Sequence, residues 1–235
     1  MTDEAAAHRY AVYYAPPPES PLERFGVGWL GRHHRTGERL AQPAVAGIDA
    51  DRLRALTAAP RRYGFHGTLK APFRLARGCK GDDLHAAVEA FARSRSAFTL
   101  PPLVVADLAG FLALVPSAPA PALDELAAAS VRAFEPFRAP LTAEERARRP
   151  VHRLSARQRR HLESFGYPHV FEDFAFHMTL TERLAETEKS ILLPQLQDLA
   201  AGPAAEPLSV DAIAVYEEPR PGAPFHLTAR FAFGA

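Results

Sequence analysis

The sequence predicts an α+β fold in which antiparallel sheets pack against helices. Segments in which apolar residues alternate, as they do in strands, are interleaved with segments at helical spacing. Several strands follow one another as hairpins, which favours antiparallel pairing. The order strand, helix, strand pair, helix occurs twice along the chain, so we expect two similar halves.

Length and composition are those of an ordinary globular protein. The chain has 235 residues, of which 47% are hydrophobic and 23% charged, enough for one large domain or two small lobes. We therefore expect residues 1–235 to form a single bilobal domain. The formal net charge of +1 makes neither nucleic acid nor a membrane a necessary partner.

The sequence also limits the compartment. A single cysteine, Cys79, excludes an internal disulfide and suits a reducing environment. The N-terminal segment MTDEAAAHRYAVYY carries early acids and lacks the apolar region of a signal peptide. No apolar run approaches the roughly 18 residues of a membrane span. We expect a cytoplasmic protein that does not bind membranes.

The elements of the first half have clear boundaries. A strand is predicted over 9–15, where alternation is strict. Ser20 as N-cap, followed by Pro21 and Glu23, begins a helix that ends near Gly31. The elements that follow are a loop over 33–47, a helix over 49–59, a strand over 63–69 that Pro72 closes, a helix over 82–95, a hairpin over 98–116 and a helix over 122–134.

The second half repeats this alternation. Ser155 and Gln158 form a capping box that begins a helix, and Gly166 ends it. The remaining predicted elements are a strand over 171–180, a helix over 187–200 interrupted at Pro194, and two strands over 210–216 and 225–233.

Two distant segments share one pattern, aromatic-x-Phe-His-x-Thr-Leu. They are YGFHGTL, which contains His66 and Thr68, and FAFHMTL, which contains His177 and Thr179. Because side chains alternate between the faces of a strand, each segment would bury its aromatic residues and present its His-Thr pair on the opposite face. The predicted motif strands cover 63–70 and 171–181.

The paired residue types point to acid–base chemistry on a phosphodiester. The pKa of histidine, near 6.5, allows one imidazole to act as a base while another donates a proton. A threonine hydroxyl on the same face can donate a hydrogen bond to a nonbridging phosphate oxygen as negative charge develops there. We therefore predict His66, Thr68, His177 and Thr179 as catalytic residues.

Five further side chains are candidate substrate contacts. Lys70 and Thr181 occupy matching places after the two motifs, and Lys70 would present a point charge to a phosphate. Tyr10 and Tyr14 on the first strand could line a cleft, and Arg153 precedes the second motif. Each of these residues could instead be structural or simply solvated.

Arginines gather before both motifs. Over 144–161 they could form a basic flap for a second phosphate or an RNA backbone, or a solvated surface. The two arginines before the first motif could likewise either bind phosphate or be solvated. The residues are Arg146, Arg148, Arg149, Arg153, Arg157, Arg159 and Arg160, with Arg61 and Arg62 before the first motif.

Other histidines give no familiar metal-ligand spacing. No carboxylate or cysteine completes a set around the His33–His34 pair or among His152, His161 and His169. We expect neither a metal nor a cofactor. A third His-x-Thr match, His226-Leu-Thr228, is interpreted as a chance occurrence, and we expect it outside the catalytic cluster.

The paired motifs resemble those of the 2H phosphoesterase superfamily. That superfamily includes bacterial RNA 2′,3′-cyclic phosphodiesterases with 2′–5′ ligase activity, and nucleotide cyclic phosphodiesterases. The resemblance implies a bilobal α+β fold with two pseudo-symmetric lobes, in which two His-x-Thr strands face each other across a central cleft. It also implies catalysis without a metal.

A narrower resemblance involves longer segments. YGFHGTLKAPF, RYAVYYAP, WLGR and GYPHVFEDFAFHMTLT are similar to the branch of the superfamily encoded with phosphonate-degradation genes. This resemblance implies a sugar cyclic phosphate as substrate, such as 5-phosphoribosyl 1,2-cyclic phosphate. The partner expected is thus a small phosphorylated molecule.

Two alternatives remain open at the level of sequence. An RNA-end cyclic phosphodiesterase or ligase would use the same four residues, but would need an open basic groove with exposed aromatic side chains. A noncatalytic nucleotide- or RNA-binding module would have no need for two complete His-Thr pairs. The oligomeric state and the division of acid and base between the histidines are left undecided.

Overall fold

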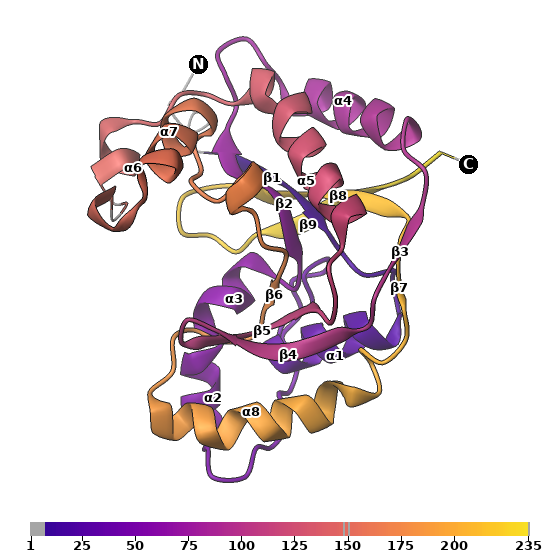
Figure 1. The fold of residues 1–235 in the computed structure, drawn as a ribbon, viewed down its shortest axis with the longest axis vertical. Helices are drawn as coiled ribbons and strands as arrows, with labels where there is room; N and C mark the ends of the chain where they lie inside the picture. The colour runs from indigo at the N-terminus through magenta and orange to yellow at the C-terminus, as the bar shows by residue number, and fades with distance from the viewer. Residues whose placement is uncertain (1–7, 148, 150, 235) are drawn as a thin grey trace.

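The computed structural model describes residues 8–147, 149 and 151–234. One lobe is built on a four-stranded antiparallel sheet with the order β2-β1-β8-β9 (Figure 1). Two helices, α4 and α5, pack against one face of this sheet. The elements are β1 (Arg9–Tyr14), β2 (Gly67–Arg74), β8 (Ala212–Glu218), β9 (His226–Ala232), α4 (Gly81–Arg93) and α5 (Pro121–Ala133).

The other lobe contains a smaller antiparallel sheet with the order β4-β5-β6, against which α8 packs. Helices α1, α2 and α3 lie beside it (Figure 1), and the short pair β3-β7 runs along one side of the molecule. These elements are β4 (Leu103–Leu108), β5 (Phe111–Pro116), β6 (Met178–Thr179), α8 (Glu186–Ala201), α1 (Pro21–Leu30), α2 (Ala50–Leu56), α3 (Ala58–Tyr63), β3 (Phe98–Leu100) and β7 (Leu208–Val210).

The arginine-rich region forms short elements at the edge of the first lobe. They are α6 (Ala143–Ala147), a 3₁₀ turn over Val151–Arg153 and α7 (Ala156–Phe165), with further 3₁₀ turns at Glu135–Phe137 and Phe171–Asp173. The α+β class and its antiparallel sheets are confirmed. Within the described residues, no helix combines the length and apolarity needed to cross a bilayer.

Local sequence signals placed the ends of α1 and α7 correctly, whereas the helix predicted over 49–59 is replaced by the two helices α2 and α3. Ser20 accepts a hydrogen bond from the Glu23 amide, and Gly31 closes α1 in the left-handed conformation. Ser155 and Gln158 form the expected reciprocal capping box of α7. These contacts satisfy backbone groups that a helix leaves unpaired at its ends.

The motif segments differ from the prediction because strand structure covers only part of them. Helix α3 extends through Tyr63, and Gly64 ends it at a φ of +81°, so β2 begins only at Gly67. In the second segment, a 3₁₀ turn precedes an extended loop, and only Met178 and Thr179 pair with β5. Pattern alone cannot distinguish an extended loop from a strand, because pairing partners decide the difference.

Two of the prolines expected to end or interrupt an element lie inside it instead. β2 continues through Pro72, which is tolerated because β2 is an edge strand of its sheet. Helix α8 likewise runs through Pro194 without ending there. Both proline-based boundaries predicted from the sequence are therefore wrong.

Helix α1 contacts both motif segments. Phe65 packs against Gly26 so closely that a Cβ on that glycine would lie 2.0 Å from the phenyl ring. Three residues later, Trp29 donates a hydrogen bond of 2.9 Å from its Nε1 to the Leu180 carbonyl. One apolar core includes Val12 and Leu69 of one lobe together with Leu112 of the other. The two lobes are therefore packed together beneath the motifs.

The motifs also contact each other directly. A Cβ built on Gly67 would lie 2.2 Å from the Phe176 ring, so the ring packs directly on the glycine backbone.

We predict that Gly67→Ala overpacks this junction and lowers the free energy of unfolding by about 1–3 kcal/mol. Gly28→Ala in α1 is the matched control, because nothing lies within 4 Å of its Cβ. Alanine there should be neutral or stabilising by up to about 1 kcal/mol. Urea unfolding measures both, and a Gly67→Ala protein as stable as the wild type would contradict the contact.

Candidate active site

His66 is held between a helix end and an edge strand. Its Nδ1 lies 2.8 Å from the Gly64 carbonyl oxygen, and its Nε2 lies 3.2 Å from the Thr68 hydroxyl. The imidazole stacks on Tyr13, with ring centroids 3.7 Å apart. The ring is therefore fixed on one face by an aromatic side chain and at one nitrogen by the backbone.

His177 repeats the backbone contact of His66. Its Nδ1 lies 2.8 Å from the carbonyl oxygen of Ala175, which is again two residues earlier. A carbonyl only accepts hydrogen bonds, so in each neutral ring Nδ1 carries the proton. Both histidines therefore keep the Nε2 lone pair for chemistry, and the repeated sequence pattern corresponds to a repeated side-chain geometry.

The two motifs line adjoining cavities in a crossed arrangement. His66 and Thr179 line a cavity of about 270 Å³ together with Tyr63 and Phe111. A second, narrower cavity of about 20 Å³ is lined by Thr68 and His177, with other residues from both motif segments.

Each cavity thus takes a histidine from one motif and a threonine from the other. β2 and β6, which carry the two threonines, contact each other at this point. The four predicted catalytic residues therefore line two cavities where the motif segments meet, and Phe111 of the His66 cavity lies beside the His177 ring, with ring centroids 5.7 Å apart.

The electrostatic environment of His66 disfavours its charged form. Burial lowers the pKa of His66 to about 4, against the opposing effect of the Gly64 carbonyl, and nearby His177 and His34 lower it further. His66 is therefore neutral at pH 7. Nε2 of a neutral ring with its proton on Nδ1 is a proton acceptor.

Lys70 does not share the face of His66 and Thr68, and that prediction is wrong. On β1, Tyr13 pairs with Thr68 whereas the neighbouring Val12 pairs with Lys70, so a bulge at Leu69 breaks the alternation. Lys70 consequently points to the helix-covered side with Val12. There its ammonium donates to the Val131 carbonyl and to Glu135, so it is unavailable to a substrate in these cavities.

The other candidate contacts are distributed differently. Tyr10 and Tyr14 lie in the main apolar core, so their predicted place in a cleft is wrong. Thr181 does line the cavity of His66, but it is buried and its hydroxyl accepts from the Leu112 amide. Arg153 is exposed on its 3₁₀ turn and lines neither cavity.

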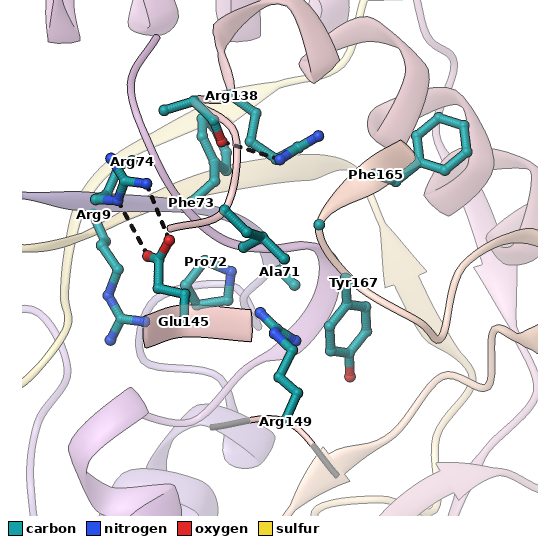
Figure 2. Close-up of a pocket in the computed structure, with 13 residues that line it drawn as sticks. Arg9, Ala71, Pro72, Phe73, Arg74, Arg138, Glu145, Arg149, Phe165 and Tyr167 are labelled. Atoms are coloured by element: carbon teal, nitrogen blue, oxygen red, sulfur yellow. Dashed lines mark hydrogen bonds and ion pairs between the residues drawn. The ribbon is translucent and has the colours of Figure 1, made fainter. Parts of the chain in front are cut away.

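The arginines before the second motif do not form one continuous basic surface. Arg157 pairs with Asp173, and Arg159 donates to the Leu154 carbonyl. Arg149 instead turns into a pocket beside Tyr167 (Figure 2). Arg148 lies outside the described residues. Of the pair before the first motif, Arg62 donates to the buried Glu218, and Arg61 donates to the Arg54 carbonyl and the Thr57 hydroxyl.

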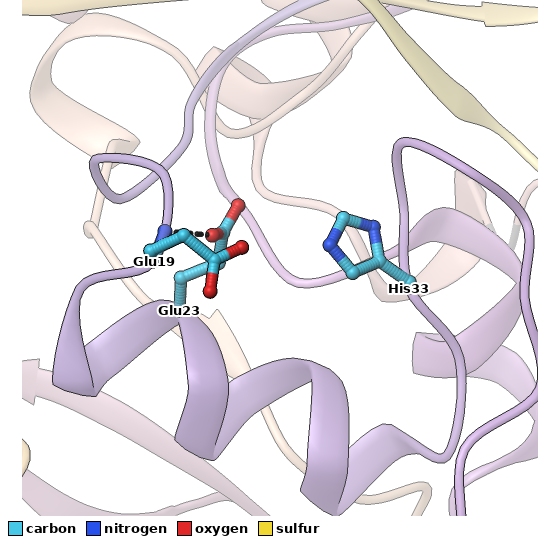
Figure 3. A group of neighbouring side chains, drawn as sticks. All are labelled: Glu19, Glu23 and His33. Carbon is cyan, nitrogen blue, oxygen red and sulfur yellow. Dashed lines mark hydrogen bonds between the residues drawn. The ribbon is translucent and has the colours of Figure 1, made fainter.

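One group among the described residues has potential metal ligands close together. Glu19, Glu23 and His33 place one ligand atom each within 4.8 Å of the others (Figure 3). The Glu23 carboxylate already accepts from Arg35 and from the Glu19 amide, and it pairs with His34. Those partners lower the pKa of Glu23 to about 2 even though burial opposes them, so its charge is compensated without a cation.

His226 lies apart from both motifs. Its Nε2 lies 3.2 Å from the Arg32 guanidinium, and its ring covers Gly37. It lines neither of the two cavities between the motifs. This placement agrees with a chance occurrence of the third His-x-Thr match.

Three residues around the two histidines were not predicted from the sequence. Tyr13 lies on the face of its strand opposite Tyr10 and Tyr14 and stacks on His66 from the buried side. His169 and Tyr167 line the cavity of His177 from the loop before it. Burial lowers the pKa of His169, and His177 lowers it further. Only the alternation along β1 could have revealed Tyr13, since the loop has no periodicity.

The structure thus brings two His-x-Thr segments close together in an α+β fold with antiparallel sheets. The chain belongs to the family described as "Protein of unknown function (DUF1045)", which matches residues 68–226.

Two curated relatives carry the name "Ribose 1,5-bisphosphate phosphokinase PhnN". The protein from Janthinobacterium sp. (strain Marseille) is 41% identical over 221 residues, which are 92% of this chain and 49% of that protein. The protein from Laribacter hongkongensis (strain HLHK9) is 38% identical over 220 residues, 93% of this chain and 50% of that protein. This chain therefore spans about half the length of the relatives it matches.

Among solved structures, E. coli LigT complexed with phosphate has 14% identity and a TM-score of 0.41, covering 98% of this chain and 99% of LigT. The conserved protein of unknown function ATU0111 from Agrobacterium tumefaciens str. C58 has 13% identity and a TM-score of 0.42, covering 97% and 90%.

The lowered pKa of His66 has a measurable consequence. We predict that its Hε1 resonance titrates near pH 4 in the folded protein. In the unfolded chain histidine titrates near pH 6.5, so between these values the unfolded state binds the extra proton. Stability contributed by His66 is therefore complete above about pH 6.5 and is lost as the pH falls toward 4. His66→Gln should flatten the dependence of unfolding free energy on pH in this window, and a His66 midpoint at 6.5 would contradict the buried environment.

Proposed function

We propose that this protein is a metal-independent cyclic phosphodiesterase in which His66 and His177 act as base and acid. The observation that carries the proposal is the crossed arrangement of the two cavities, in which the Nδ1 of each histidine bonds to a carbonyl and Nε2 is left off the backbone, that of His66 beside the Thr68 hydroxyl. Two imidazoles and two hydroxyls supply proton transfer and charge stabilisation without a Lewis acid.

The proposed step is an in-line hydrolysis. His66, neutral at pH 7, removes a proton from water as the water oxygen bonds to phosphorus. His177, in its protonated form, donates its Nε2 proton to the ring oxygen as the phosphorus–oxygen bond breaks. Thr68 and Thr179 donate hydrogen bonds to the nonbridging oxygens. The product is a phosphate monoester with a free hydroxyl, and proton exchange with water restores both imidazoles.

The substrate we favour is a small sugar cyclic phosphate, such as 5-phosphoribosyl 1,2-cyclic phosphate. The cavity of His66, about 270 Å³, suits a small molecule, and the relatives' name refers to a ribose bisphosphate. An RNA or nucleotide 2′,3′-cyclic phosphodiesterase would use the same chemistry. A reducing compartment suits the lone Cys79, so the proposed location is the cytoplasm.

A kinase activity is not proposed for this chain. The sequence contains no GxxxxGK[ST] loop of the kind that holds nucleotide phosphates in P-loop kinases. The relatives named as kinases are about twice as long as the matched segment, so their name can describe their remaining half.

The four residues should contribute unequally to turnover. His66→Ala and His177→Ala should each lower kcat by about 10²–10⁴-fold, because each removes a proton-transfer group. Thr68→Ala and Thr179→Ala should cost about 10–10³-fold, as the loss of one donor to developing charge does. His226→Ala, outside the two cavities, is the matched control and should retain wild-type kcat. The assay follows ring opening of cyclic phosphates by phosphorus NMR, with EDTA present.

The pH profile separates the two histidines. The low-pH limb of kcat/KM should belong to His66 and disappear in His66→Ala, while His177→Ala should remove the other limb. Loss of turnover in EDTA with recovery on addition of Zn²⁺ or Mn²⁺ would refute the mechanism. So would a protein in which His226 matters and either His66 or His177 does not.

A further inference from the structure

Another cavity, lined by arginines, adjoins the cavity of His177. It has a volume of about 200 Å³ and lies where β2 passes the loops after α5 and α7. Ala71 and Tyr167 line both this cavity and the one that holds His177 and Thr68. The two spaces are therefore neighbours that share a wall.

The charge around this arginine-lined cavity is strongly positive. Figure 2 shows four guanidinium groups converging on it, opposed by one carboxylate, Glu145. Both Glu145 oxygens bond to Arg74, so that pair is neutral. Two further carboxylates near the cavity each form ion pairs with two cations. Glu218 pairs with Arg9 and Arg62, and Glu135 pairs with Arg138 and Lys70.

Of the described arginines that line this cavity, Arg149 is the one with no ion pair, and Glu145, which is bonded to Arg74, attracts it without direct contact. Among the described residues, no hydrogen bond or ion pair joins its side chain to another group, although the side chain is half-buried. It lies beside Tyr167 at the wall shared with the cavity of His177 (Figure 2). A guanidinium that is partly removed from water and bonded to no carboxylate can bind an anion. Its parallel N–H groups can donate two hydrogen bonds to two oxygens of one phosphate.

The spacing limits the size of the ligand. Thr68 and Ala71 are three residues apart on β2, so the shared wall at Ala71 lies within about 10 Å of Thr68, since a strand rises about 3.3 Å per residue and the bulge at Leu69 only shortens the path. A reacting phosphate at Thr68 therefore lies within the length of one small sugar of the arginine-lined cavity. A polymer is not required to bridge the two places.

We propose that Arg149, with Arg9 and Tyr167, forms a subsite for a second phosphate group, so that the preferred substrate is a cyclic phosphate carrying a phosphate monoester at its other end. This inference rests on the proposed cyclic phosphodiesterase activity. The subsite selects the substrate through binding and takes no part in proton transfer. Its loss should therefore raise KM and leave kcat nearly unchanged.

The test compares two substrates that differ by one phosphate. Wild-type protein should open 5-phosphoribosyl 1,2-cyclic phosphate with a kcat/KM at least about 10-fold above that for ribose 1,2-cyclic phosphate. Arg149→Gln should reduce this ratio toward one, chiefly by raising KM for the phosphorylated substrate. Arg149→Lys, which keeps the charge but not the fork, should restore part of the ratio.

Arg160→Gln is the matched control, because Arg160 is an exposed arginine of the same region that does not line the cavity. Its ratio should equal that of the wild type, and thermal unfolding should show that all variants are folded. A wild-type ratio near one, or a ratio unchanged in Arg149→Gln, would overturn the subsite while leaving the cyclic phosphodiesterase intact.

Failure of the proposed activity gives a different result, in which neither ring is opened by the wild type. The subsite is then judged by calorimetric binding of ribose 5-phosphate, which involves no ring opening. Affinity at least about 10-fold weaker in Arg149→Gln than in Arg160→Gln would support it. Equal affinities, or no binding by the wild type, would overturn it.

Discussion

The contact between the two histidine segments is the constraint on which the site depends. Neither segment is a long strand, so backbone pairing alone does not fix their relation. Instead, Phe176 rests on the bare backbone of Gly67, and α1 holds both segments from below through Gly26 and Trp29. Because a densely packed interior has little room to relax, a small change of side-chain volume at this contact displaces the neighbouring segments.

That packing places two similar histidines in different surroundings. His66 is enclosed by Tyr13, Tyr63 and Tyr216, and burial lowers its pKa. Tyr216 also donates to the Phe65 carbonyl, which ties the sheet to the first motif. His177 lies on an extended loop beside Phe111. The aromatic enclosure and lowered pKa of His66 support the proposal that it is the base of the pair.

Sequence reasoning succeeded where the determinants are local. The capped helices α1 and α7, the hairpin β4-β5 and the His-Thr repeat all depend on residues within a few positions of each other. It failed where a tertiary partner decides. The bulge that turns Lys70 away is set by its register with β1. Likewise, the arginine-lined cavity joins Arg9 to Arg149 across most of the chain, a proximity that no periodicity encodes.

The central claim, that His66 and His177 flank one phosphate, is tested most directly by nitrogen-15 NMR of the imidazole rings during titration with inorganic phosphate. If the proposal holds, the Nε2 resonances of both histidines should shift together along one saturation curve, while that of His226 stays unchanged, because His226 lines neither cavity between the motifs. A response from one histidine alone, or two curves with different midpoints, would contradict a common phosphate site.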